Sequence, residues 1–420
     1  MSPGVGAPQV RTGLLLALVI AWLVRGWYIV LLPAYAYSWD MSCWEEIAHF
    51  IGSGTNPYMT TTSMSWPPFW LMCLFVLDRI AEFGSFAFLD VLRAFLLVVE
   101  SIGLVLAWLV AKRTVPGASS TRVLLFGLAL NPIAILLTCQ HGNFDSLVSL
   151  WVMATLLALL AYLRTQEPMD WLIACLFLGL GVMTKTVPFA LAPLLVPGAK
   201  VMTPKARMLG AALFAGPSAV GLGVLFALAP QSIIERVLLY SPVAGRFGFS
   251  GIATILGITE AIPTLGKISS FTILALIGWG CAKAWSWKNV RETQVVLLAG
   301  LILLAIPTLG PGFGPQYAFW FLAPLAVSYL AGSVRWKVTL VAVYAVTAIT
   351  YVLLYGFAWD LGQSIFFLWD SPHARWLGAA LRHNAPRAWV TLPMFVSWLG
   401  LLAAGVVEFR AQAAEERVSA

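Results

Sequence analysis

The chain has 420 residues, of which 60% are hydrophobic and 10% are charged. Soluble domains carry about 25% charged residues, so this composition excludes an ordinary soluble globule and predicts a polytopic membrane protein. The net charge of +7 does not indicate nucleic-acid binding, because Lys and Arg lie in short segments between apolar runs rather than on one stripe or tail. The five Cys are scattered without a CxxC pair, which predicts neither a disulfide framework nor a zinc site.

Apolar runs long enough to cross a bilayer recur along the whole chain. A span needs about 20 apolar residues, and the first run is too long for a cleaved signal peptide, so it predicts a retained first span. The pattern predicts an all-α membrane helix bundle of about 12 spans, within a range of roughly 11 to 13, that forms one integral-membrane domain over residues 1–420. The expected spans are 12–33, 88–111, 122–139, 145–163, 170–186, 187–198, 207–228, 268–285, 292–309, 316–332, 337–356 and 388–408.

The basic residues predict the orientation of the bundle. With the N-terminus in the cytoplasm, nearly every compact Lys and Arg cluster falls on the cytoplasmic side. This arrangement requires that 67–83, which opens with Pro67-Pro68 and contains Asp78 and Arg79, lies at the outer surface or dips into the membrane and returns. The outer loops are then 34–87, 229–267 and 357–387, with short turns at 140–144 and 310–315.

The first outer loop carries the most distinctive acid. Residues 42–51 predict a short amphipathic interfacial helix, with Trp44 on its apolar face and Asp40 just before its start. Asn56-Pro57-Tyr58 follows as a turn. A carboxylate held at the membrane surface among aromatic residues makes Asp40 the first candidate for a catalytic base.

Two further segments combine polar residues with breaks between spans. His141, Asn143 and Asp145 lie in His-Gly-Asn-Phe-Asp, and we expect them to project at the outer surface, as an exposed turn or as part of a site. Lys185 lies where one span ends and a Pro-interrupted one begins. Such broken helices are tolerated where they line a cavity, so Lys185 either binds an anionic group or snorkels to the interface.

Two charges fall deep inside expected spans: Arg25 in the first and Glu100 in the second. Each costs about 2.5–3.5 kcal/mol at the bilayer centre. We therefore expect them to pair across adjacent helices in a structural role.

The order of these motifs resembles a known family. Asp40 after the first span, the segment Ala48–Trp70 with Asn-Pro-Tyr and Pro-Pro-aromatic, the His-Gly-Asn-Phe-Asp turn and the stretch Phe313–Pro324 resemble the GT-C superfamily of integral-membrane glycosyltransferases. Within that superfamily the closest resemblance is to the mannosyltransferases of the GT87 and PIG-M-like groups.

The resemblance implies a polyprenyl-phosphate-linked sugar donor and transfer of a hexose, most simply mannose, with inversion. The acceptor would be a hydroxyl on a glycolipid, a polysaccharide or a protein, and the active site would face the outside of a bacterial inner membrane. The sequence itself contains no Gly-rich phosphate loop, which agrees with a donor supplied by membrane lipid. Asp40 takes the place of the family's base, but Met41 and Ser42 follow it where some members have a second acid, so no metal cofactor is expected.

Each candidate residue then receives a role. Asp40 would accept the proton of the attacking hydroxyl, with Asp145 as the alternative base. The donor phosphate would be bound by Lys185, Arg246, His141 and Arg375. The sugar or acceptor would be bound by Trp44, Asn56, Tyr58, Asn143, Gln316 and Tyr317.

A lipid or solute transporter is the alternative from a different class. A transporter should place its polar residues near the midplane, accessible from both sides, whereas here they gather on one expected face. A structural subunit of a cell-envelope complex is a third reading, and it would tolerate loss of Asp40.

Overall fold

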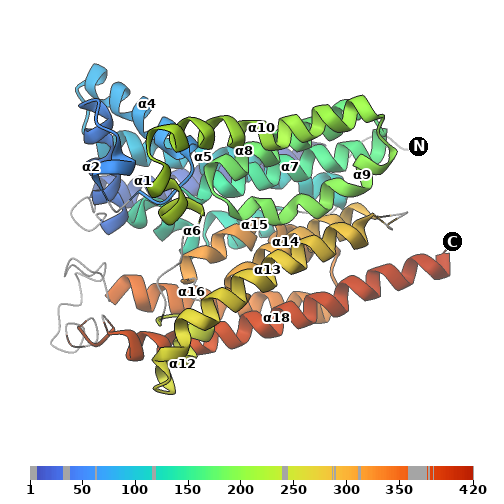
Figure 1. The fold of residues 1–420 in the computed structure, drawn as a ribbon. Coiled ribbons are helices and arrows are strands. Elements are labelled where there is room, and N and C mark those ends of the chain that lie inside the picture. The colour runs from blue at the N-terminus through green and yellow to red at the C-terminus, as the bar shows by residue number, and fades with distance from the viewer. Residues whose placement is uncertain are drawn as a thin grey trace.

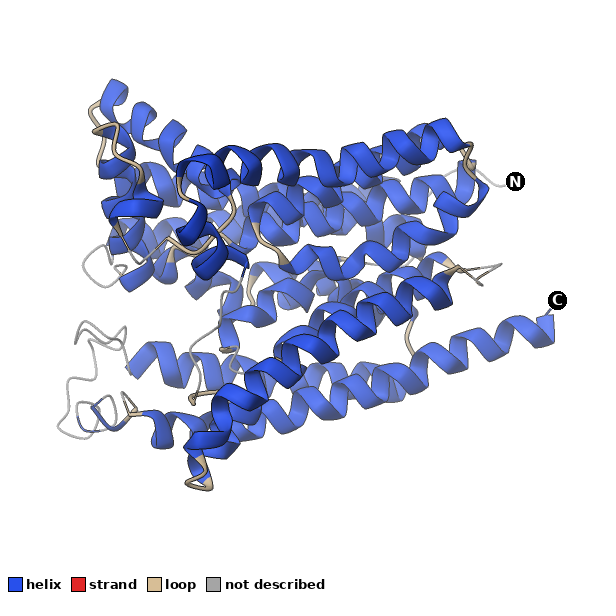
Figure 2. Cartoon of the chain, in the orientation of Figure 1, coloured by secondary structure: helices blue, strands red, loops and turns tan. Residues whose placement is uncertain are grey.

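The computed structural model is a bundle of helices, and the described residues contain no strand (Figure 2). The structure describes residues 7–31, 38–61, 64–115, 120–238, 245–285, 287, 290–310, 314–357, 376, 379–381 and 383–419. Within these ranges seven helices are long and apolar enough to cross a membrane, or eight if one bent pair counts as a span. This confirms an all-α, multi-pass integral membrane protein; the count of about 12 spans stays a prediction.

The first half of the chain contains α1 (Ala7–Leu31), α2 (Trp39–Gly52), α3 (Pro57–Thr60), α4 (Pro68–Gly84), α5 (Phe88–Thr114), the π-helix η2 (Val123–Ala129), α6 (Pro132–Leu136), the π-helical turn η3 (Leu137–His141), α7 (Asp145–Thr165) and α8 (Pro168–Thr184). The second half contains the 3₁₀ helix η4 (Val187–Leu195), α9 (Val196–Val201), α10 (Pro204–Leu228), α11 (Pro230–Ser232), η5 (Ile233–Leu238), α12 (Gly248–Ile255), η6 (Thr259–Ala261), α13 (Ile262–Ala284), α14 (Glu292–Leu309), η7 (Pro315–Ala318), α15 (Phe319–Ala331), α16 (Val334–Phe357) and α18 (Asn384–Ser419).

The long helices run side by side along one axis (Figure 1). In α7, 78% of the apolar window is buried, whereas none of the window of α13 is buried. Helix α7 packs on α5, α8 and α15, and α14 packs on α15 and α18. A helix that is apolar all round is a core helix when it is covered and a lipid-facing one when it is not, so α13 belongs to the lipid-facing rim.

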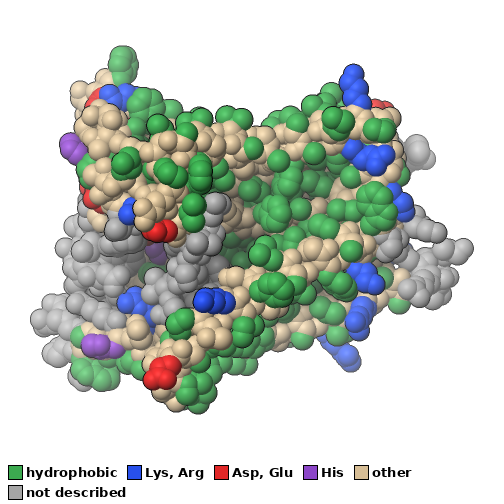
Figure 3. Space-filling model, in the orientation of Figure 1, with side chains coloured by type: hydrophobic (Ala, Val, Ile, Leu, Met, Phe, Trp, Pro, Cys, Tyr) green, Lys and Arg blue, Asp and Glu red, His purple; other side chains and the backbone are tan. Residues whose placement is uncertain are grey.

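The two ends of the bundle differ. Both termini lie at one end, and α2 and α4 lie at the other (Figure 1). Lys and Arg side chains line the end with the termini, several more lie toward the other end, and hydrophobic side chains are spread over the surface between the ends (Figure 3). Arg164 donates to Glu292 over 2.8 Å and also to the carbonyl of Arg113. The basic clusters after α5 and α7 and before α14 therefore meet at one end, as the orientation argument expects; that this end is cytoplasmic stays a prediction.

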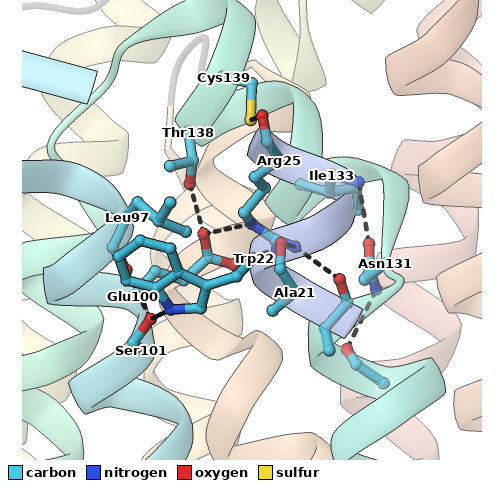
Figure 4. Close-up of polar contacts among 12 residues, drawn as sticks. Ala21, Trp22, Arg25, Leu97, Glu100, Ser101, Asn131, Ile133, Thr138 and Cys139 are labelled. Carbon is cyan, nitrogen blue, oxygen red and sulfur yellow. Dashed lines mark hydrogen bonds and ion pairs between the residues drawn. The ribbon is translucent and has the colours of Figure 1, made fainter. Parts of the chain in front are cut away.

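The ion pair expected inside the membrane is present (Figure 4). Arg25 Nε donates to Glu100 Oε2 over 2.7 Å, and a second bond joins the same two groups. Thr138 donates to Glu100 over 2.8 Å, and Arg25 donates to the carbonyl of Ala129 over 2.7 Å. Arg25 is fully buried and Glu100 is 7% exposed, so this network joins α1, α5, η2 and η3 deep in the bundle.

Two elements differ from or refine the sequence expectation. Helix α2 begins at Trp39, three residues before the expected start, so Asp40 lies in its first turn and not ahead of it. The reason is Ser38, whose side chain accepts from Met41 N and caps the helix. The segment expected at 67–83 is α4, which carries Asp78, Arg79 and Glu82 and does not qualify as a span.

Candidate active site

Asp40 is held at the end of the bundle by the start of α2. The Ser38 hydroxyl that caps α2 also donates to the carbonyl of His141 over 2.7 Å. The indole of Trp44, one turn further along α2, donates to the carbonyl of Gly142 over 2.9 Å. Two hydrogen bonds thus fasten α2 to the turn between η3 and α7, and they place Asp40 against that turn.

The His-Gly-Asn-Phe-Asp turn points inward. His141, Asn143 and Asp145 are 7%, 8% and 0% exposed, so the expectation that they project at the outer surface is wrong. Gly142 adopts φ +61°, and a Cβ there would lie 2.5 Å from the Met41 side chain. Only glycine fits this left-handed, crowded position, and it lets the chain reverse so that the side chains on both sides of it face the bundle.

The Asp40 carboxylate has one oxygen bound and one left open. His141 Nε2 lies 3.2 Å from Oδ2, and Asn143 Nδ2 donates to the same oxygen over 2.9 Å. Among the described residues none donates to Oδ1, and the side chain remains 14% exposed. Burial raises the pKa of Asp40, but the charge of His141, the hydrogen bonds from His141 and Asn143 and the charge of Lys185 outweigh it, so the pKa lies below its usual value.

Two tyrosines of α16 stand behind His141. The hydroxyl of Tyr351 lies 3.0 Å from His141 Nδ1, and the ring of Tyr355 lies 4.8 Å from the imidazole. Tyr355 donates to Gln316 Oε1 over 2.6 Å, which links η7 to the same network. The sequence analysis did not select either tyrosine. Their four-residue spacing near the end of an expected span puts both on one helix face, and this spacing could have identified them.

Lys185 and Asp145 form a second charged centre. Lys185 Nζ lies 2.6 Å from Asp145 Oδ1, and Asp145 Oδ2 has no hydrogen-bond partner among the described residues. The ammonium also lies 5.3 Å from the ring of Phe144 and 4.9 Å from the rings of Tyr317 and Trp320. Lys185 is 12% exposed, so it does not snorkel into water; it sits in an aromatic cage that stabilises a cation.

Three residues assigned to sugar or acceptor binding have structural contacts instead. Trp44 and Tyr58 are fully buried, so neither ring can stack on a sugar in this structure. Trp44 packs against Trp70 and Phe144, and Tyr58 donates to the carbonyl of Trp66 over 2.5 Å. Asn56 Oδ1 caps α3 by accepting from Tyr58 N over 3.1 Å, so the Asn-Pro-Tyr motif acts as a local helix start.

Arg246, one of the two remaining phosphate candidates, contacts α18 in the described part of the structure. Arg246 donates to Asn384 of α18 over 2.8 Å, and its carbonyl accepts from Thr391. Arg375 lies outside the described residues. Arg93 of α5, which the sequence reading missed, is 4% exposed and places a guanidinium nitrogen 3.6 Å from Met41 Sδ, beneath the Asp40 turn. Arg93 could have been identified from the sequence, because it is a charged residue inside an expected span.

No group of three His, Cys, Asp or Glu that could hold a metal occurs among the residues that the structure describes. The absence of a metal cofactor stays a prediction.

The chain was compared with family models, curated proteins and solved structures. No family model matches the sequence, and no curated protein matches it. The crystal structure of ArnT from Cupriavidus metallidurans bound to undecaprenyl phosphate is similar, with a TM-score of 0.45 and 14% identity over 97% of this chain and 79% of that one. Similarity at this level is too low to transfer a function.

Proposed function

We propose that this protein is a membrane glycosyltransferase of the GT-C type that uses a polyprenyl-phosphate-linked sugar. It transfers a hexose, with mannose as the first candidate, to a hydroxyl acceptor on the outer face of a bacterial inner membrane, with inversion. Asp40 is the general base. The acceptor belongs to a glycolipid, a polysaccharide or a protein.

The observation that carries this proposal is the state of the Asp40 carboxylate. Oδ2 is fixed by His141 and Asn143, whereas Oδ1 has no donor among the described residues. A general base needs one oxygen within about 2.6–3.2 Å of the hydroxyl that it deprotonates. Its side chain must also be held in one rotamer. Oδ1 of Asp40 lies on a partly exposed side chain that a bound hydroxyl can reach, whereas the unpaired Oδ2 of Asp145 is fully buried.

The proposed reaction needs a single carboxylate. The acceptor oxygen attacks the anomeric carbon from the face opposite the phosphate, while its proton passes to Asp40 Oδ1. The bond between the anomeric carbon and the phosphate oxygen breaks, and polyprenyl phosphate leaves with that electron pair. Phosphate is a good leaving group, so the second carboxylic acid that a glycoside hydrolase requires is not needed.

Lys185 is the proposed cation for the departing phosphate. It lies at a break between α8 and η4, and its charge is close enough to lower the pKa of Asp40. Charge builds on the phosphate in the transition state, where a preorganised ammonium stabilises it most. Asp145 is fully buried and holds Lys185, which fits a positioning residue better than an alternative base. Gln316 and Tyr317, both partly exposed, are the proposed contacts to sugar hydroxyls.

The test is transfer by the purified protein in lipid with a polyprenyl-phosphate sugar. Asp40→Asn should reduce kcat by about 10²–10⁴, the usual contribution of a general base. Glu46→Gln, on an exposed face of the same helix, is the matched control and should be unaffected. Near-normal transfer by Asp40→Asn excludes Asp40, and loss in Asp145→Asn alone moves the base there.

Two further measurements separate the alternatives. Activity that survives EDTA supports the expectation of a metal-independent enzyme, and loss that Mg²⁺ or Mn²⁺ restores contradicts it. In a Gln316→Cys variant, the new thiol should react with a labelling reagent only from the outer side of the membrane. Labelling from both sides favours a transporter.

A further inference from the structure

An apolar cavity of about 390 Å³ lies on the side of the bundle, between the bent helix pair η2–α6 and the helices α15 and α16. Its walls are mostly apolar; the lining includes Val123, Phe126, Pro132, Leu340, Val341 and Ala345. Phe126 and Val341 are 67% and 57% exposed, so the cavity is a groove open at the surface of the bundle.

The groove exists because the first helix of its wall is broken. Helices η2 and α6 meet at 43°, where Asn131 caps α6 and Pro132 cannot continue the preceding helix. Small residues face the gap: a Cβ on Gly127 would already lie 3.4 Å from Ala326. Helix α6 contacts α16, and the cavity lies between the bent pair and α16.

One end of the groove is cationic. Arg122, which is exposed, is part of the lining at the end of the bundle with the basic clusters. Lys337 Nζ lies 5.6 Å from the ring of Tyr329, which also lines the groove. Within the described part of the chain no carboxylate forms an ion pair with Arg122 or Lys337. Two uncompensated cations at the mouth of an apolar groove suit an anionic headgroup joined to a hydrocarbon chain.

We propose that this groove binds an anionic phospholipid of the leaflet at the basic end of the bundle. One acyl chain lies along α16 and the phosphate rests at Arg122 and Lys337. From Leu340 to Ala348 the groove follows α16 for about 12 Å, close to half of a hydrocarbon core of about 30 Å. The groove therefore has the depth of one leaflet. It ends about one turn before Tyr351, on the other side of which the Asp40 site lies.

The experiment is native mass spectrometry of the purified full chain in mild detergent, titrated with dioleoyl phosphatidylglycerol or dioleoyl phosphatidylcholine. Wild type should retain phosphatidylglycerol preferentially. Ala345→Phe fills the groove from an exposed position and should weaken retention roughly tenfold or more, because two or more methylenes lose their burial. Ala342→Phe, on an exposed face of the same helix outside the groove, should bind as wild type does.

The charge is tested separately. Arg122→Ala combined with Lys337→Ala should weaken phosphatidylglycerol retention by about fivefold per cation and leave phosphatidylcholine unchanged. Lys205→Ala, an exposed cation at the same end, is the control. Equal retention of both lipids by wild type, or equal loss in Ala342→Phe and Ala345→Phe, overturns the proposal. Loss of polyprenyl phosphate and not of phosphatidylglycerol in Ala345→Phe overturns it as well, because the groove would then hold the tail of the donor.

Discussion

Removing one partner of the buried Arg25–Glu100 pair should destabilise the fold strongly. Glu100→Gln keeps the shape of the side chain but leaves the fully buried Arg25 guanidinium without its counter-charge. Breaking a buried pair in this way costs about 3–5 kcal/mol, because the remaining charge stays desolvated. The Thr138 hydroxyl can still donate to the new amide oxygen. The decrease in the free energy of unfolding therefore comes from the unpaired charge and not from that hydrogen bond.

Removing both partners should recover most of that loss. Arg25→Met with Glu100→Leu replaces the pair by apolar side chains, which is often neutral or stabilising by about 1–4 kcal/mol. A charge swap should recover less, because Arg25 also donates to the carbonyl of Ala129, and a carboxylate at position 25 would face that oxygen. In the cycle of Arg25→Met, Glu100→Leu and the double variant, the two single losses should not add, and the coupling energy should reach or exceed about 3 kcal/mol, the upper end of the usual range for contacting residues.

The assay is reversible unfolding by SDS in bicelles, followed by tryptophan fluorescence. Glu167→Gln, at an exposed acid between α7 and α8, is the control and should change the free energy of unfolding by less than about 0.5 kcal/mol. Strictly additive single and double variants would refute the pairing as a source of stability.

Three further predictions concern the site. The pKa of Asp40 lies below its usual value, so the group is charged near neutral pH, and its stabilising effect is lost only as pH falls through the lowered pKa. Asn143→Ala removes one of the hydrogen bonds that lower this pKa, so any acid limb of kcat/KM that Asp40 causes should move to higher pH. Lys185→Met should lower both stability and transfer, and adding Asp145→Asn should restore the stability alone; if transfer returns too, Lys185 has no role beyond its ion pair. Asn56→Ala should lower stability by about 1 kcal/mol through loss of its cap and leave the KM for the sugar donor unchanged, which a urea or SDS titration and donor kinetics would check.

Several parts of the site were readable from the chain because their signals are local. Ser38 and the apolar spacing of 44, 47 and 48 define a capped amphipathic helix, so the start of α2 beside Asp40 could be expected to within three residues. The break at Lys185 was readable from Pro188, and the pairing of Arg25 with Glu100 from the cost of an isolated charge in hydrocarbon.

Other parts depended on which surfaces meet. The inward direction of His141 and Asn143 follows from the left-handed Gly142 and its contact with Met41, about 100 residues away in the chain. No local signal shows that Trp44 and Tyr58 are core residues, because an aromatic residue on a helix face fits a core as well as a sugar platform.

Composition and spacing by themselves determined that this chain enters the membrane as many helices, that its basic ends share a side, and that its lone charges need partners. These properties follow from the transfer free energy of each segment into lipid, which is a sum over neighbouring residues. Only the packing decided that Asp40 has one oxygen held and one open, that Lys185 is caged by Asp145 and three rings, and that a groove opens beside a broken helix. Hydrogen bonds and cavities form between segments far apart in the chain, so their geometry exists only once the helices are in contact.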